Sequence, residues 1–255
     1  MDIETIQEAE VSDLIQWPRA KYWTAQWNPI IGCIPCSPAC EHCYAAAWAR
    51  RFGQSFEPHE SSQERPPRRG VVFCGNMTDL FGEWVYHPHN NIGLVKSFAN
   101  SNASLLWLTK RASRMCDALT AFEFDDLSNH FFGFTAENQE WYERRFAEFR
   151  KIPTRFKGWL SAEPLLGSID LGLNHVYPPE AAPFSWVVVG CESGPNRRPC
   201  KLEWIESIVD QCRAANVPVF VKQICIGGKC VTDINQFPEH LRIRQVPWAK
   251  EGENK

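Results

Sequence analysis

The chain has 255 residues, of which 44% are hydrophobic and 22% charged, and its formal net charge is −3. This length is enough for one large core, and α/β barrels are commonly of this size. The small negative charge excludes a strong general attraction to polyanions, so any contact with nucleic acid must be local.

No membrane association is expected. The sequence has no apolar run long enough to span a bilayer, and the first residues lack the basic-then-apolar order of a signal peptide. We therefore expect a cytoplasmic protein, in which thiols stay reduced. Disulfides are then not expected to account for the eleven cysteines. An odd number of cysteines also cannot all pair within one chain. Metal ligation is the favoured interpretation.

Short apolar runs recur along the chain, and each is followed by a helical pattern. They cover residues 71–74, 105–108, 131–134, 158–161, 186–189 and 217–221, with a further strand predicted at 29–33. Continuous apolar runs predict strands buried on both faces, as in parallel sheets covered by helices. Helical spacing is clearest over 202–215, and the segments after Cys40 and Asn138 are also predicted to be helices.

This alternation predicts an α/β fold in a single domain. We expect a partial (β/α) barrel of six or seven parallel strands, similar to a TIM barrel, over residues 23–232, with a doubly wound sheet as the alternative. Residues 54–70 are rich in Pro, Ser, Glu and Arg and predict a mobile surface loop, either solvated or in contact with phosphates. Residues 1–22 and 233–255 are predicted to be an N-terminal extension and a C-terminal appendage.

Charged residues follow the carboxyl ends of the predicted strands. They are Asp79, Lys110, Glu137, Glu163, Glu192 and Lys222. Any one of them also fits a helix cap or a solvated loop charge. Because barrel folds assemble their sites at this edge, the set as a whole predicts a common pocket.

Four cysteines, Cys33, Cys36, Cys40 and Cys43, lie within eleven residues. The spacing Cys36-x3-Cys40-x2-Cys43 is that of radical S-adenosylmethionine enzymes, where three thiolates hold a [4Fe–4S] cluster. The fourth iron is then open to the amino and carboxylate groups of S-adenosylmethionine. Alternatively, all four thiolates close a tetrahedral zinc site, or Cys36 is a bystander. The position of the loop, between a strand-like run and a helical stretch at 45–51, favours the cluster.

Several further stretches match a known family. They are residues 27–29, 32–33, 37–38, 40–45, 76–81, 108–111, 135–138, 160–166, 190–194 and 220–223. On these stretches the chain resembles phage and prophage proteins of gp-thirty-seven/gp-sixty-eight type, which carry a three-cysteine motif and are similar to radical S-adenosylmethionine enzymes. The resemblance implies an iron–sulfur protein but supplies no substrate. It places the three cysteines at Cys33, Cys40 and Cys43, which leaves the first ligand open between Cys33 and Cys36, with Cys33 preferred.

Analogy with radical enzymes also suggests cofactor-binding residues. Gly190 and Glu192, with Ser193 beside them, are candidates for the amino and carboxylate ends of S-adenosylmethionine, although Ser193 and Gly194 also fit a simple turn. Asp79, Glu137 and Glu163 are candidates for ribose hydroxyls or substrate. Lys110 and Lys222 are candidates for neutralising a carboxylate or phosphate.

The remaining cysteines are expected to be less informative. Cys225 and Cys230 lie close in sequence, with Cys200 not far off, and a second cluster there is conceivable, but incidental thiols are the preferred interpretation. Cys74, Cys116 and Cys212 fall in strand or helical patterns and are predicted to be core residues.

Two functions fit these features of the sequence. The first is a radical S-adenosylmethionine enzyme that needs a reductant protein as partner and acts on a nucleotide or nucleic acid. The choice of substrate rests only on the phage setting of the resemblance and on local arginines such as Arg50, Arg51 and Arg65. The second is a zinc-stabilised protein that binds nucleic acid or a partner and has no catalytic activity.

Overall fold

The computed structural model describes residues 20–63, 65–85, 93–95, 101–120, 127–173, 183–194 and 196–247. Most of the predicted N-terminal extension, and residues 248–255 of the predicted C-terminal appendage, lie outside these ranges. Across the described ranges, no helix combines the length and the apolar character that crossing a membrane requires.

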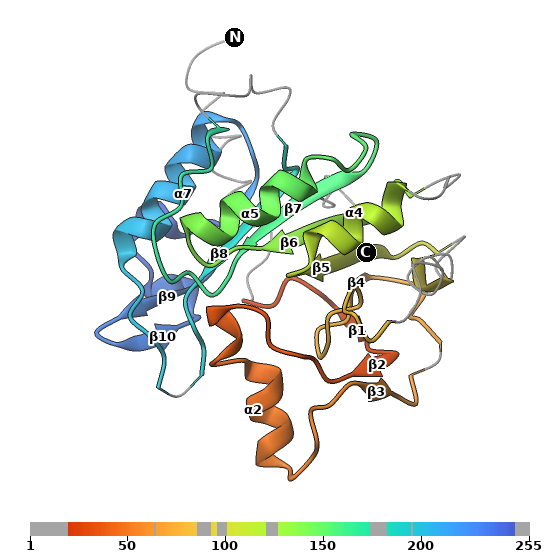
Figure 1. Cartoon of the computed structure of the whole chain (residues 1–255). Coiled ribbons are helices and arrows are strands. Elements are labelled where there is room, and N and C mark those ends of the chain that lie inside the picture. The colour runs from red at the N-terminus through yellow and green to blue at the C-terminus, as the bar shows by residue number, and fades with distance from the viewer. Residues whose placement is uncertain are drawn as a thin grey trace.

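One eight-stranded sheet forms the centre of the fold (Figure 1). Its strands, in spatial order, are β1 (Ala25–Trp27), β4 (Val71–Cys74), β5 (Ser104–Thr109), β6 (His130–Thr135), β7 (Lys157–Ala162), β8 (Trp186–Gly190), β9 (Val219–Ile226) and β10 (Lys229–Val231). In this order, the strands from β1 and β4 through β9 each pair in parallel with the next, and β10 pairs with β9 in the antiparallel sense. The predicted α/β fold with a mostly parallel sheet is confirmed.

The strand order follows the sequence without a reversal. A doubly wound sheet reverses its strand order at a switch point, so this sheet is singly wound. β1 and β10 form its two edges, and the sheet is open rather than closed among the described residues. The register aligns Thr135 with Ser161 and Gly190 with Gln223, which brings polar residues of neighbouring strands to the same carboxyl edge.

The prediction of a first sheet strand at 29–33 is wrong in position. The strand that joins the sheet is β1, and Ile30–Ile31 instead forms β2, which pairs with β3 (His59–Glu60) in a separate two-stranded sheet. Pro29 lies between β1 and β2. Because proline has no N–H to donate to a ladder, it separates the two pairings.

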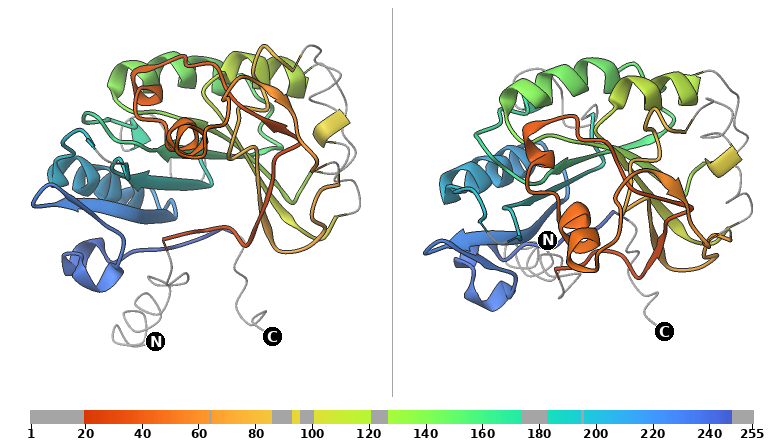
Figure 2. Two further views of the ribbon diagram at one scale, coloured as in Figure 1. Left: turned by 90° about the horizontal axis from the view of Figure 1, so that it is seen from below. Right: turned by 60° about the horizontal axis from the view of Figure 1, so that its bottom comes forward.

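Three helices cover one face of the sheet, and α2 (Tyr44–Arg51) lies apart from them (Figure 2). The three are α4 (Ala112–Thr120), α5 (Gln139–Phe149) and α7 (Leu202–Ala214). The predicted helix over 202–215 is confirmed, with Ile205, Ile208 and Val209 on its buried side. α5 begins after Asn138, whose side chain accepts a hydrogen bond from Trp141 N at 3.1 Å, so a capping residue fixes its start.

Alternation along the strands sorts their side chains onto two faces. One face packs against the helices and carries Cys74. Cys116 of α4 and Cys212 of α7 are buried as well, which confirms the prediction of all three as core residues. The other face carries a smaller, largely aromatic cluster: Tyr22, Val71, Phe73, Leu106, Phe131, Trp159, Trp186, Val188, Phe220 and Val246. Ser161 and Lys222 each lie two positions beyond a member of this cluster on the same strand, so their side chains share its face, nearer the carboxyl edge.

Residues 232–246 complete the outer side of β9. Arg244 is fully buried and donates to the carbonyl oxygens of Val221 at 3.3 Å, Lys222 at 3.2 Å and Thr232 at 2.7 Å. Leu241 is also fully buried and joins the core against the helices. This segment therefore fixes the backbone of β9 at the position where Lys222 projects.

Candidate functional site

A cavity of about 410 Å³ opens at the carboxyl ends of the parallel strands, a volume within the usual range of small-molecule sites. Ten of the twelve sequence-predicted site residues line it: Cys33, Cys36, Cys40, Cys43, Asp79, Lys110, Glu163, Glu192, Ser193 and Lys222. Gly190 and Glu137 are the two that do not. The fold thus brings the cysteine loop and most of the strand-end charges to one place.

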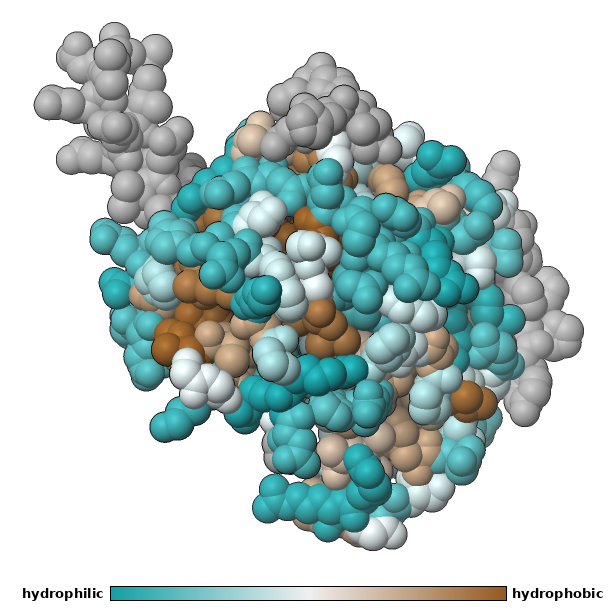
Figure 3. All heavy atoms as spheres, turned by 60° about the vertical axis from the view of Figure 1, so that its left-hand side comes forward, coloured by the Kyte–Doolittle hydropathy of each residue, from teal (hydrophilic) through white to brown (hydrophobic). Residues whose placement is uncertain are grey.

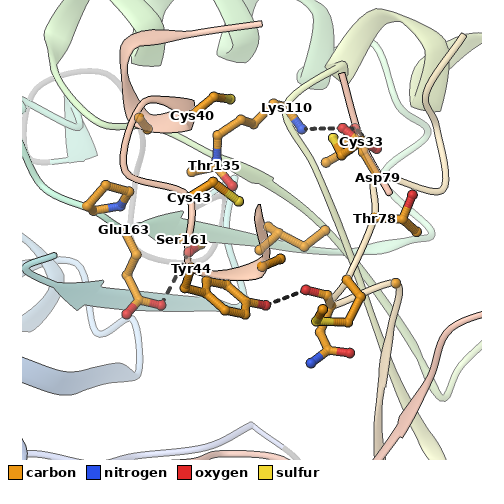
Figure 4. A pocket seen from close by; sticks show the side chains of 18 of the residues that line it. Cys33, Cys40, Cys43, Tyr44, Thr78, Asp79, Lys110, Thr135, Ser161 and Glu163 are labelled. Carbon is orange, nitrogen blue, oxygen red and sulfur yellow. Dashed lines mark hydrogen bonds between the residues drawn. The ribbon is translucent and has the colours of Figure 1, made fainter. Parts of the chain in front are cut away.

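The thiols of the cysteine loop face this cavity. Figure 4 shows the side chains of Cys33, Cys40 and Cys43 around one hollow, with Lys110 and Thr135 beside them. All four loop cysteines are partly exposed, unlike the fully packed Cys74 of the core. Among the described residues, no group of three or more His, Cys, Asp and Glu side chains is spaced to hold a single metal ion.

The loop cysteines differ in acidity. A hydrogen bond from the Cys36 thiol lowers the pKa of Cys40 to about 4, against the effect of burial, and the Lys110 ammonium adds to the lowering. Burial, followed by the charge of Asp79, raises the pKa of Cys33 to about 12. These contacts therefore favour the thiolate form of Cys40, whereas burial and Asp79 favour the protonated form of Cys33.

Two arginines fasten the backbone of the cysteine loop. Arg111, which follows β5, donates from Nη2 to the Ile34 carbonyl oxygen at 3.0 Å. Arg198, in the segment after β8, donates from Nη1 to the Pro38 carbonyl oxygen at 3.0 Å. The loop is therefore held at two points by side chains that follow two different strands, β5 and β8, and reach its carbonyl groups.

Glu192 links the cysteine loop to the segment after β8. Its carboxylate accepts from the Arg198 backbone N–H at 2.7 Å, from the Arg198 guanidinium, and from His42 Nδ1 at 2.9 Å. Burial acts to raise the pKa of Glu192, but the hydrogen bonds from Arg198 and His42 outweigh it and hold the pKa below its ordinary value. Both oxygens are thus occupied by protein donors, and the residue orients its neighbours.

Asp79, in the segment that follows β4, has a similar organising role. Its carboxylate accepts from Thr109 Oγ1 at 2.7 Å, from the Lys110 N–H at 3.0 Å and from Arg111 Nη1 at 3.2 Å. Asp79 is buried, and its partners lie at the end of the neighbouring strand β5. It therefore positions Arg111, which in turn holds the loop.

A polar group at the cavity floor surrounds Glu163. Lys222 Nζ lies 3.0 Å from Glu163 Oε1, and Ser161 Oγ lies 3.5 Å from Oε2. The Tyr22 hydroxyl also bonds to this carboxylate; burial, and then the charge of Glu163, raise the pKa of Tyr22 well above its ordinary value. A Cβ atom at Gly190 would lie only 2.8 Å from Glu163 Oε1. Because glycine has no side chain, the Glu163 carboxylate can occupy this position without a steric clash.

Glu137 lies outside the cavity, in a buried ion pair. Its Oε2 is 2.7 Å from Arg145 Nη1, and both side chains are almost completely buried. Asn138 caps α5 immediately after Glu137, so the chain turns into the helix and brings Arg145 back over the strand end. Arg145 also donates to the Thr135 carbonyl oxygen at 2.7 Å, so this pair supports the strand end that carries Thr135.

A family model described as "Protein of unknown function (DUF5131)" matches residues 18–237. The chain belongs to the DUF5131 family. The match takes in the cysteine loop and the strands β1 to β10. No curated protein and no solved structure matches the chain significantly. The DUF5131 description names no reaction, and the resemblance to three-cysteine phage proteins stays a prediction.

Proposed function

We propose that this DUF5131 protein is a radical S-adenosylmethionine enzyme in which Cys33, Cys40 and Cys43 hold a [4Fe–4S] cluster. The observation that carries the proposal is that these three thiols open together onto one cavity at the carboxyl edge of a parallel sheet. Three thiolates leave one iron of such a cluster open to a further ligand. When bound, the cluster supplies the electron that cleaves the sulfonium of S-adenosylmethionine.

The donor set fits the group. Thiolates are the ligands that iron–sulfur clusters use, and the hydrogen bonds from Cys36 lower the pKa of Cys40 and so favour its thiolate form. Cys36 hydrogen-bonds to the Cys40 sulfur, and we assign it this supporting role rather than that of first ligand. Hydrogen bonds to ligand sulfurs tune the reduction potential of a cluster, so Cys36 would influence the site without binding iron.

The scaffold supports the same proposal. We interpret the singly wound sheet as a partial (β/α) barrel, with the aromatic cluster filling its inner face below the cavity. In barrel folds the active site lies at the carboxyl edge of the strands. The cysteine loop lies at this edge, fastened by Arg111 and Arg198, so the ligands are oriented before a cluster binds.

Binding of S-adenosylmethionine would use the cavity's polar groups. Within the described residues, the Lys110 ammonium pairs with no carboxylate side chain, and it lies close enough to Cys40 to lower its pKa, so it suits the carboxylate of the cosubstrate. Glu163 and Ser161 provide an acceptor and a hydroxyl for ribose. Glu192 would act indirectly, by holding His42 and Arg198 in place.

A nucleotide or nucleic acid is the substrate class that the surface near the site supports. α2 starts directly after Cys43 and exposes Tyr44 and Trp48, and Phe52, which caps the end of the helix, is exposed too, so the three rings lie at intervals of four residues. The Trp48 and Phe52 rings lie 4.9 Å apart, and the Arg51 guanidinium lies 5.9 Å from the centre of the Phe52 ring. Exposed aromatic rings next to arginine bind single-stranded nucleic acid by stacking and phosphate contacts.

The test is reductive cleavage of S-adenosylmethionine by anaerobically purified protein. With dithionite or a reductant protein, we expect 5′-deoxyadenosine and methionine from the wild type and neither product from Cys43→Ala. A colourless protein that holds one zinc per chain and leaves S-adenosylmethionine intact would overturn the proposal in favour of a zinc-stabilised binding protein.

A further inference from the structure

Four other cysteines gather on the side of the molecule formed by β8, α7 and the β9–β10 hairpin. Cys191 follows β8 directly, Cys200 precedes α7 by two residues, Cys225 lies on β9 and Cys230 on β10. On this side, apolar atoms appear among a mostly hydrophilic surface (Figure 3). The four cysteines are distant in sequence from the cysteine loop and lie in regular elements or directly beside them.

The backbone places two of these thiols next to each other. Cys225 and Cys230 are direct partners in the antiparallel β9–β10 ladder. Direct partners point to the same face, with their Cβ atoms about 4.5–5.5 Å apart. The connecting residues Gly227 and Gly228 both have positive φ, +55° and +74°, as a two-residue hairpin turn of this kind requires. The turn fixes the register, and the register fixes the cysteine pair.

The other two thiols approach this pair from the core. The Cys191 side chain is hydrogen-bonded to that of Cys230 and interacts electrostatically with Cys200 and Cys225. Cys191 and Cys200 are 2% and 7% exposed, whereas Cys225 and Cys230 are partly exposed. The group therefore has two members in the core and two toward solvent, and Cys191 also lines the cavity described above.

We propose that Cys191, Cys200, Cys225 and Cys230 form a second metal centre, with four thiolate ligands for an iron–sulfur cluster or a zinc ion. Both metals share this ligand chemistry. The positive charges of Arg197 and Lys222 act on Cys230, and Arg197 Nη1 is fixed by a 2.9 Å hydrogen bond to the Gly228 carbonyl oxygen. Two cations beside the group offset part of the negative charge of the thiolates.

Metal binding would draw the four side chains closer, since no three described His, Cys, Asp or Glu side chains already have the spacing of a single-ion site. Thiolates around an iron–sulfur cluster bind different irons and so lie further apart than the ligands of one ion. The proposal concerns other residues than those of the proposed function and does not rest on it.

The test is metal and sulfide analysis of full-length variants purified without oxygen. Cys33→Ala/Cys40→Ala/Cys43→Ala should retain either about four irons with sulfide or one zinc per chain. Cys225→Ser/Cys230→Ser should lose that metal and keep the metal of the cysteine loop. Cys116→Ser, a buried cysteine of α4 outside both groups, is the matched control and should keep all metal.

Native mass spectrometry of the wild type decides the question even if a variant fails to fold. A wild-type mass with neither a cluster nor zinc would overturn the proposal, as would a single cluster that Cys225→Ser/Cys230→Ser retains, or a folded triple variant without metal. If the triple variant retains metal while the wild type cleaves no S-adenosylmethionine, the second centre stands and the proposed function fails. The two proposals can thus be separated.

Discussion

The two cysteine groups are held by different kinds of interaction. Cys33 to Cys43 lie on a loop that contains one short 3-10 helix, Pro38–Cys40, and the side chains of Arg111 and Arg198 hold its carbonyl groups. Cys225 and Cys230 lie on paired strands, where backbone hydrogen bonds and a glycine turn set their positions. The first group faces the cavity, and the second is partly buried against the core.

This difference separates two ways of building a thiol site. A loop held by side chains can leave one position of a metal cluster open to a ligand, as catalysis requires. The second group of cysteines is anchored on strands, and two of its four members are buried. Such an arrangement suits a metal centre with no open position, which has a structural or electron-transferring role. Substitutions that loosen the side-chain anchors should therefore affect the loop group alone.

The largest effect is expected from the loop ligands themselves. Cys40→Ala and Cys43→Ala should each abolish iron binding at the loop, because two thiolates do not retain a four-iron cluster. The measurement is iron content and absorbance near 400 nm of anaerobically purified protein, with Cys116→Ser as control. Unchanged loop iron in either variant would refute the assignment.

The buried ion pair between Glu137 and Arg145 should contribute to the stability of the whole fold. Its loss should therefore not affect one cysteine group more than the other. Arg145→Ala leaves a fully buried carboxylate without its partner and should lower the free energy of unfolding by about 3–5 kcal/mol. Urea unfolding measures this loss, and Arg145→Met/Glu137→Leu should recover much of it. If Glu137→Gln reduced S-adenosylmethionine binding without loss of stability, Glu137 would be a ligand-binding residue after all.

Removing a loop anchor should weaken metal binding at the loop only. Arg111→Ala releases the Ile34 carbonyl and the Asp79 carboxylate, and residues that orient metal ligands typically contribute about 10–100-fold to metal affinity. Competition with a chelator measures the affinity. Arg213→Ala removes an exposed ion pair with Asp210 and is the control. An equal loss at both cysteine groups would contradict the distinction drawn between them.

The contribution of Glu192 to the free energy of unfolding should depend on pH. Because its folded pKa lies below the ordinary value of 4.5, the carboxylate stabilises the fold above that pH, and this contribution is lost as pH falls through the folded pKa. The difference in free energy of unfolding between wild type and Glu192→Gln should therefore narrow as the pH is lowered. A constant difference from neutral to acid pH would show that the charge has no such role.

The smallest effect is expected at Cys36. Cys36→Ala removes a hydrogen bond to Cys40 and should leave iron content unchanged, whereas Cys33→Ala should abolish loop iron. Iron retained in Cys33→Ala and lost in Cys36→Ala would make Cys36 the first ligand.

Much of the scaffold is predictable from local pattern. Six strands of the sheet follow from continuous apolar runs, since parallel strands covered on both faces must be apolar throughout. The common pocket follows because the carboxyl ends of parallel strands share an edge, and Lys110, Glu163 and Lys222 line it as predicted.

The remainder depends on contacts that local pattern does not show. β1 has only three residues and stands next to Pro29, so its apolar signal is too short to separate from β2. Glu137 has the same strand-end position as the cavity residues. Its carboxylate nevertheless lies outside the cavity, because it forms a buried ion pair with Arg145, which is two helical turns further along the chain. The convergence of Cys191 with Cys230 depends on the register of β9 and β10 with the strands beside them, which no stretch of sequence displays alone.

The central claim is that the loop cysteines hold a cluster with one iron open to S-adenosylmethionine. Electron paramagnetic resonance of reduced Cys225→Ser/Cys230→Ser protein, with and without S-adenosylmethionine, tests it most directly, because only the loop group remains. We predict a reduced-cluster signal that changes when S-adenosylmethionine is added and is absent from protein that also carries Cys43→Ala. A signal that S-adenosylmethionine leaves unchanged, or protein without iron and sulfide, would contradict the claim.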